Sequence, residues 1–300
     1  MNPLLSVIVH GWRGGLALTA TLDSLLGQTL PAVEILVAVD PAVQAEADVI
    51  LKLYGPAVRS IPCGGSRTAA AFNRAIGELS GRHLAFLRAG AQWPANAAAA
   101  LTARLEQQPF CDALAIDRAL PAGSERVVTL IDLIAVASEL DLATAVFRRD
   151  AVIAAGMFDE GIRERFDVDL YLRLAWRRHG IVCCAAPRGA TLAAAHAAGD
   201  GRVRDLEAVA SVLERFAHRH PLDATTRTAL RVRNMTLIDR LEIEQAKCRM
   251  AEGHADAARF HLASARWPSW RVRLAIALLR LMPRFATTLY QHLPGATSLL

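Results

Sequence analysis

The stretch LLSVIVHGWRGGLALTATLDSLLGQTLPAVEILVAVD, residues 4–40, decides the fold. An apolar run breaks at Gly11, a segment with Leu18, Leu22 and Leu25 at helical spacing follows, and a second apolar run ends at Asp40. A helix between two buried strands forms a βαβ unit, whose right-handed crossover makes the strands parallel and brings their carboxyl ends to one edge. The stretch therefore predicts an α/β domain.

Three side chains with binding chemistry converge on that edge. His10 ends the first apolar run, Trp12 follows its break at Gly11, and Asp40 ends the second run. Because ligands of open α/β sheets bind at the carboxyl ends of the strands, we expect a nucleotide pocket there. A dinucleotide-binding fold is the first alternative, but its GxGxxG fingerprint needs a glycine where GWRGG has Arg13, which argues against an oxidoreductase.

Strands and helices continue to alternate beyond this unit. Helices are expected at 69–80, with Gly81 as the stop, and at 96–108 and 166–180; a core strand is expected at 83–87, and a strand that passes into a short helix at 142–156. The alternation ends near residue 221, and from Asp223 onward the pattern is helical. We therefore expect an α/β domain at residues 1–221 and a helical C-terminal subdomain at 222–300.

The composition narrows the class of protein. A chain of 300 residues with 53% hydrophobic content can bury a sizeable core. The net charge of +5 comes almost entirely from arginines, with lysine only at Lys52 and Lys247, and these arginines are scattered along the chain. Without a basic block, nucleic-acid binding is not expected.

The cysteines and the apolar runs predict the compartment. Five cysteines are an odd number with no CxxC spacing, and Cys183 and Cys184 fall in an apolar run, which is typical of reduced core residues. The start MNPLLSVIV has no basic leader, and no uncharged apolar run reaches the ~20 residues of a membrane span. We expect a cytoplasmic protein, soluble or peripheral at the inner face of the membrane.

The order and spacing of the segments resemble glycosyltransferase family 2, the inverting nucleotide-sugar glycosyltransferases with the GT-A fold, over residues 3 to about 200. The stretch 4–40 is similar to the first strand, the helix with a SLLxQT ending, and the second strand of that family. GGSRTAAAFNRAIGELSGRHLAFL resembles the next helix and the strand that leads to the metal motif, and FRRDAVIAAGMFDE with FDVDLYLRLA resembles the acceptor-side segments.

The resemblance assigns the nucleotide base to the pocket at Trp12 and Asp40, with His10 on the same donor side. An indole can stack on a nucleobase, and a carboxylate can accept an N–H from its edge. The alternatives are that Trp12 caps the core and that Asp40 begins a turn before Pro41. The implied donor is a nucleotide-diphosphate sugar, most simply a UDP-sugar.

The family's metal motif, Asp-x-Asp after an apolar strand, is missing from this chain. Its place holds Arg88, Ala89, Gly90 and Ala91, and neither guanidinium nor glycine can replace an oxygen ligand of a divalent cation. We therefore expect no Mg²⁺ or Mn²⁺ requirement and no metal ligands, with Arg88 facing the diphosphate in place of the metal. The alternative is that Arg88 points into solvent from a surface turn. His196, in a late histidine segment similar to the family's, is a further donor-binding candidate.

Asp167 is the candidate catalytic base, because it matches the aspartate of the family's Glu-Asp pair, although Phe166 stands where the glutamate is expected. Such a carboxylate takes the proton of the acceptor hydroxyl. The alternative is a first-turn aspartate that stabilises the helix dipole. Asp169 points away from Asp167 on a helix and is expected to be solvated or to face the acceptor. Asp159 and Glu160 are acceptor candidates or plain turn residues.

The C-terminal part is expected to be helical and to make external contacts. Residues 241–268 resemble a tetratricopeptide-type hairpin with a turn at Gly253, which needs further units to bury a core. The last segment is apolar with Arg271, Arg273, Arg280 and Arg284, and it predicts either contact with an anionic membrane surface or a helix pair that covers the domain or forms a homodimer.

Two functions remain open at this point. The first is transfer of a sugar, with inversion, from a nucleotide-diphosphate donor to a glycan or lipid-linked glycan, which the presence of Asp40 and Asp167 favours. The second is a non-catalytic relative that binds a nucleotide, glycan or protein partner, which the loss of the metal motif favours.

Overall fold

The computed structural model describes residues 4–30, 33–63, 68–117, 120–136, 142, 145–177, 181–188, 190, 200–266 and 269–292. The chain divides into two compact units, Met1–Ala195 and His196–Leu300. The boundary predicted near residue 221 lies instead inside the second unit, between helices α8 (Asp200–Arg219) and α9 (Ala224–Ala251). The reason is that α8 packs along α9.

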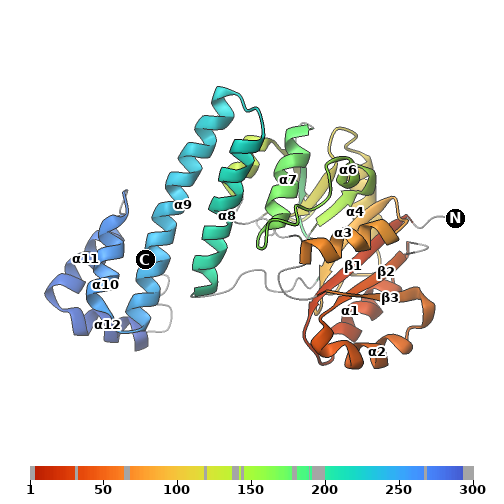
Figure 1. Cartoon of the computed structure of the whole chain (residues 1–300), viewed down its shortest axis with the longest axis horizontal. Helices are drawn as coiled ribbons and strands as arrows, with labels where there is room; N and C mark the ends of the chain where they lie inside the picture. The colour runs from red at the N-terminus through yellow and green to blue at the C-terminus, as the bar shows by residue number, and fades with distance from the viewer. Residues whose placement is uncertain are drawn as a thin grey trace. The chain divides into compact units, whose positions relative to one another are not determined.

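The first unit is built on one mixed sheet. In the described residues the sheet has eight strands in the order β3-β2-β1-β4-β7-β5-β8-β6. Figure 1 labels β1, β2 and β3. The strands are β1 (Leu5–Trp12), β2 (Val33–Val39), β3 (Val58–Pro62), β4 (His83–Arg88), β5 (Ala113–Ile116), β6 (Glu125–Val128), β7 (Ala145–Arg148) and β8 (Ile181–Cys184). β3, β2, β1 and β4 are mutually parallel, whereas β7 runs against both β4 and β5, and β6 runs against β8.

Most helices of this unit were predicted from apolar residues at helical spacing, but those at Gln44–Lys52 and Leu130–Val136 were not. The helices are α1 (Ala17–Leu26), α2 (Gln44–Lys52), α3 (Thr68–Glu78), α4 (Ala97–Glu106), α5 (Leu130–Val136), α6 (Arg149–Ala154) and α7 (Phe166–Arg177), with short 3₁₀ turns η1 (Pro41–Val43) and η2 (Gly55–Ala57). On α1, the inward positions Leu18, Leu22 and Leu25 are buried in the main core. The expected α/β class with a helical C-terminal part is confirmed.

The start of the sheet follows the predicted βαβ unit with one difference. β1 does not stop at Gly11 but runs on to Trp12, and its register with β2 shifts between Val9 and Trp12. Gly11 absorbs this irregularity at φ 74, a left-handed backbone that glycine adopts without a Cβ clash. The irregularity lies at the carboxyl edge, where the ligand pocket is expected.

The second unit consists of helices in the part that the structure describes. After α8 and α9 come α10 (Ala255–Ser264), α11 (Trp270–Leu281) and α12 (Pro283–His292). Figure 1 shows α8 and α9 side by side, and α10 folds back on α9 as the predicted hairpin, through a turn with Gly253 at φ 81. A small core forms at this end from Ala246, Met250, Ala258, Leu262, Val272 and Leu279. None of the described helices is both long and apolar enough to cross a membrane.

The approach of β1 to the segment before β4 yields a first prediction, Gly81→Ala. A Cβ on Gly81 would lie 2.4 Å from Oγ and 2.6 Å from N of Ser6, so the backbone itself must shift. We expect the free energy of unfolding to fall by at least about 1–3 kcal/mol, as measured by urea unfolding. The matched control is Gly77→Ala within α3, where no atom lies within 4 Å of the added Cβ, and this variant should gain about 0.5–1 kcal/mol. Equal stability of the two variants would contradict the prediction.

Candidate active site

His10 and Arg88 lie next to each other near the carboxyl ends of two parallel strands. They are direct partners in the register of β1 with β4. A Cβ added to Gly11 would lie 3.4 Å from Cγ of Arg88, so the glycine leaves the arginine room to lie against β1. The structure thus brings together two of the predicted donor-binding residues.

Both side chains hold a buried nitrogen that has no hydrogen-bond partner among the described residues: Nε2 of His10 and Nε of Arg88. Burial, and then the charge of Arg88, lower the pKa of His10 to about 3, so its imidazole is neutral at pH 7 and has one N–H to donate. Buried polar atoms in folded proteins nearly always have partners. The pair is therefore suited to a ligand with acceptor oxygens.

Trp12 has a different environment from the one expected. Its side chain is 3% exposed and belongs to the main core, and its Nε1 donates to the carbonyl of Gly15 at 3.1 Å. A buried indole offers no face to a nucleobase, so the core alternative is the one that the burial favours. The loop after β1 is also bonded to α2, because the N–H of Gly15 donates to Oε1 of Glu46 at 2.9 Å. The sequence did not indicate this contact.

Asp40 lies at the end of β2 on the same edge and is half-buried. Its Oδ1 accepts a hydrogen bond from the N–H of Ala42 at 3.0 Å and caps η1, which is the turn role considered as the alternative. Its negative charge also contributes to raising the pKa of Cys63, after burial as the main cause. A cap uses one carboxylate oxygen and leaves the second available to a ligand.

A chain of aromatic rings connects the start of α7 to this edge. The ring of His10 lies 5.4 Å from Phe72 on α3, and Phe72 lies 5.8 Å from Phe166, the first residue of α7. Phe158 packs against both phenylalanines. The sequence had treated Phe166 only as a departure from the Glu-Asp pair. In the structure it packs the amino end of α7, where Asp167 follows, against Phe72, which in turn contacts His10 at the end of β1.

Asp167 follows in the first turn of α7 and is 8% exposed. Its Oδ1 lies 3.4 Å from Nε of Arg165, an ion pair that the sequence analysis missed although the two residues stand only two positions apart. Arg165 has φ 57, a left-handed conformation that costs a non-glycine residue on the order of 1 kcal/mol. Strained backbone of this kind clusters at functional sites, so Arg165 is an added candidate for positioning Asp167.

Asp169 is not solvated, so that alternative was wrong, and its role in facing an acceptor stays a prediction. Its side chain is 2% exposed, and Oδ2 accepts from Nε of Arg173 at 2.7 Å. Arg173 also donates to the backbone carbonyls of Ala155 and Met157. The amino half of α7 is buried on all sides, which is why a residue opposite Asp167 still lies inside. Arg173, which Asp169 pairs with, connects α7 to the turn after α6.

Asp159 and Glu160 have turn contacts. Oδ1 of Asp159 accepts from the N–H of Gly161 at 2.8 Å, and Oε1 of Glu160 accepts from Nδ2 of Asn73 at 3.0 Å. Asn73 is also bonded to both backbone groups of Phe158, so it fastens this turn to α3. These contacts correspond to the turn alternative, and an acceptor role for the two carboxylates stays a prediction. His196 lies outside the described residues.

The residues at the end of β4 do not fit the divalent cation that the fold suggests. Arg88, Ala89, Gly90 and Ala91 supply no carboxylate, and the guanidinium would repel a cation. Within the part of the chain that the structure describes, no three His, Cys, Asp or Glu side chains gather as a metal-binding group. We therefore assign no catalytic step to a metal ion.

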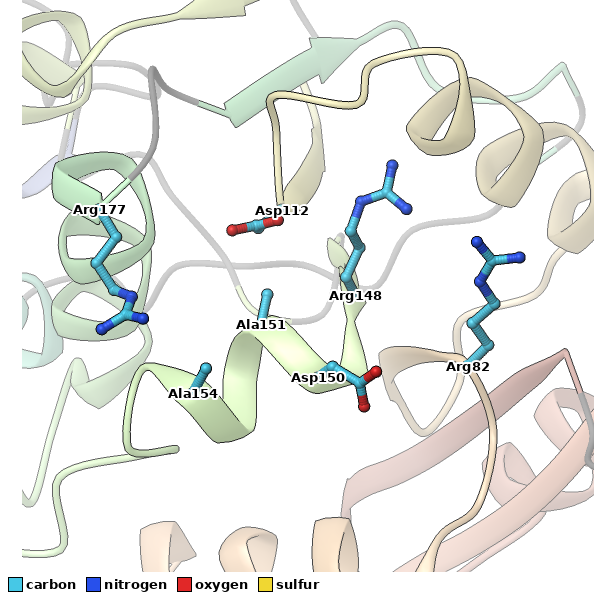
Figure 2. A pocket seen from close by; sticks show the side chains of 7 residues that line it. All are labelled: Arg82, Asp112, Arg148, Asp150, Ala151, Ala154 and Arg177. Atoms are coloured by element: carbon cyan, nitrogen blue, oxygen red, sulfur yellow. The ribbon is translucent and has the colours of Figure 1, made fainter.

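A cavity of about 540 Å³ lies at the opposite end of the strands, before β4 and β5 and after β7. Figure 2 shows its lining, Arg82, Asp112, Arg148, Asp150, Ala151, Ala154 and Arg177. Arg148 donates to the carbonyls of Cys111 and Leu105 and pairs with Glu106 at 3.3 Å, so its charge is already matched. Burial raises the pKa of Glu106, but the opposing effect of Arg148 and Arg82 is larger, so the pKa lies below its ordinary value. A structural network of ion pairs therefore borders this cavity, which lies away from the carboxyl edge where the nucleotide is expected.

A second cavity of about 340 Å³ does lie at the carboxyl edge, beyond β8. Residues of α4, the turn at Gly123 and the segment from Ala185 to Arg188 line it, with Arg104 and Arg188 as its charged members. β7 is antiparallel to both β4 and β5, so β5 runs in the same direction as β4. β8 is parallel to β5, so its carboxyl end lies at the same edge of the sheet as that of β4. None of these residues belongs to a recognisable motif, so nothing in the sequence indicated this cavity.

Solved structures are similar to this chain, whereas no family model and no curated protein matches its sequence significantly. The mannosyltransferase PcManGT from Pyrobaculum calidifontis, in complex with GDP-Man and Mn²⁺, aligns with a TM-score of 0.60 at 16% identity, over 100% of this chain and 86% of that chain. S. aureus TarS 1–349 in complex with UDP aligns with a TM-score of 0.56 at 15% identity, over 97% of this chain and 90% of that chain. The chain therefore has the fold of these glycosyltransferases.

Proposed function

We propose that this protein transfers a sugar from a nucleotide-diphosphate donor to a hydroxyl of a glycan or lipid-linked glycan, with inversion. The observation that carries the proposal is the pair of unpartnered buried nitrogens on His10 and Arg88, at the edge of the sheet where α/β proteins bind nucleotides. The fold supports it, since the similar structures hold GDP-Man, UDP and UDP-GlcNAc.

In this proposal Asp40 accepts an N–H from the base, and Arg88 and His10 donate to the diphosphate. Asp167 takes the proton of the acceptor hydroxyl as its oxygen attacks the anomeric carbon. The bond from that carbon to the diphosphate breaks on the opposite face, and its electron pair leaves with the phosphate oxygen. A guanidinium can bond two phosphate oxygens at once, so Arg88 counters the charge of the leaving group where relatives use a metal.

Donor binding should depend on Arg88 and not on a metal. We expect UDP or GDP to bind equally well with and without EDTA, and Arg88→Ala to weaken binding about tenfold to a hundredfold, because a hydrogen bond to a charged group is lost. Asp40→Asn should also weaken binding, and since asparagine still caps η1, folding is preserved. Isothermal calorimetry with UDP, GDP and ADP measures these affinities.

The matched control is Arg177→Ala, which removes an exposed arginine from the cavity at the opposite edge and should leave the affinity unchanged. Weakening by Arg177→Ala in place of Arg88→Ala would move the nucleotide to that cavity. Binding that requires added Mn²⁺ or Mg²⁺ would contradict the role of Arg88. If no nucleotide binds at millimolar concentration, the proposed donor site is wrong. The second candidate function is then a non-catalytic protein that binds a glycan or protein partner, and the missing carboxylates of the metal motif favour it.

A further inference from the structure

Helix α11 has two apolar faces, and only one of them is used by the fold. Val272 and Leu279 are buried in the small core of the second unit, which they share with residues of α9 and α10. Trp270, Leu274 and Leu281 are exposed, by 70% for Trp270 and 78% for Leu281. At about 100° per residue, these three lie within about 40° of each other and roughly opposite the buried pair. The solvent face of α11 is therefore a continuous apolar stripe.

Arginines border this stripe on both sides. Arg273 and Arg280 lie about 60–80° from its edge at Trp270 in one direction, and Arg271 lies about 60° from its edge at Leu274 in the other. All three side chains are exposed, and in the part of the chain that the structure describes they form no ion pair. Arg284 and the exposed Phe285 continue the pattern onto the start of α12. Residues 266–292 contain no aspartate or glutamate.

We propose that this surface, formed by Trp270, Leu274, Leu281, Phe285 and the four bordering arginines, binds an anionic lipid membrane. A helix of this kind lies in the plane of the interface, with its apolar stripe in the boundary between headgroups and acyl chains. The arginine stems follow the apolar surface while their guanidinium groups reach the lipid phosphates. An indole at the edge of such a stripe suits the interface, because one end of the ring is apolar and the other polar.

A second copy of the chain is a poorer occupant of the same surface. A twofold interface places the same patch of both copies together. Each copy would bring four arginines and no acidic residue of residues 266–292 to match them. Like charges brought together in this way repel. An anionic bilayer supplies the negative charge that the segment lacks, and this inference does not depend on the proposed sugar transfer.

The test is flotation of the full chain with phosphatidylcholine vesicles that contain either no or 30% phosphatidylserine. We expect binding to the anionic vesicles only, and a drop of about a hundredfold in Arg271→Gln/Arg273→Gln/Arg280→Gln, at about fivefold for each arginine. Leu281→Ser should also weaken binding, because it interrupts the apolar stripe. Circular dichroism checks that these exposed substitutions leave the helices folded.

Matched controls come from the same unit. Phe260→Ser removes an equally exposed aromatic ring outside the surface, and Arg259→Gln removes an arginine that pairs with Asp256; both should bind vesicles like the wild type. Absence of flotation, or equal binding to neutral vesicles, would overturn the proposal. So would a dimer in solution that Leu281→Asp dissociates, since the surface would then join two copies.

Discussion

Asp167→Asn should reduce turnover by about 10²–10⁴-fold while the affinity for the donor nucleotide changes little, because asparagine cannot accept the proton of the acceptor hydroxyl. The substitution keeps the size of the side chain and its place in the first turn of α7, so the packing of Phe166 on Phe72 is preserved. Release of UDP or GDP from a panel of nucleotide sugars, with glycan and lipid-linked acceptors, measures turnover. Calorimetry with the free nucleotide measures affinity.

The control for this prediction is Asp150→Asn, which also removes a first-turn carboxylate but at the cavity on the opposite edge. It should retain full turnover. Undiminished turnover in Asp167→Asn would remove Asp167 from the mechanism and leave it as a helix-dipole residue. A wild-type protein that binds nucleotide but releases none from any donor sugar would instead favour the non-catalytic alternative.

The first half of the sheet could be predicted because its strands are long apolar runs separated by periodic helices. β1, β2 and β4 were expected, and each is almost entirely buried. β3, VRSIP, was missed, since Arg59 and Pro62 are exposed and interrupt its apolar pattern. β5 and β6 were missed as well, because they have four residues each, too few for a periodicity to emerge, and they are defined by pairing with distant strands.

The site was harder to predict, because residue types indicate chemistry but not burial. Trp12 can stack on a base in principle, yet it is enclosed by the core. Asp167 and Asp169 lie on different faces of α7, as helix geometry requires. The face with Asp169 was expected to be open to solvent, but it is buried in the protein. Arg88 was predicted from the absent motif alone. Its pairing with His10 needed the strand register, which no local pattern contains.

Asp169→Ala should destabilise the first unit by about 3–5 kcal/mol, because it leaves the guanidinium of Arg173, whose side chain is only 13% exposed, without its counter-charge. Arg173 also bonds the carbonyls of Ala155 and Met157, at the turn that closes α6. Met157 has φ 57, so this turn holds a strained residue and depends on outside bonds. Urea unfolding followed by tryptophan fluorescence, with a check that the slope m is unchanged, measures the loss.

Removing both charges separates the ion pair from the rest of the contact. In Asp169→Leu/Arg173→Met no uncompensated charge remains, so the double variant should be more stable than Asp169→Ala, although the carbonyls of Ala155 and Met157 lose their donor. The exposed pair of Arg249 and Glu252 is the control, and Glu252→Ala should leave the stability almost unchanged. If Asp169→Ala costs no more than Glu252→Ala, then Asp169 is not a structural ion-pair partner, and its predicted role in facing an acceptor has to be considered again.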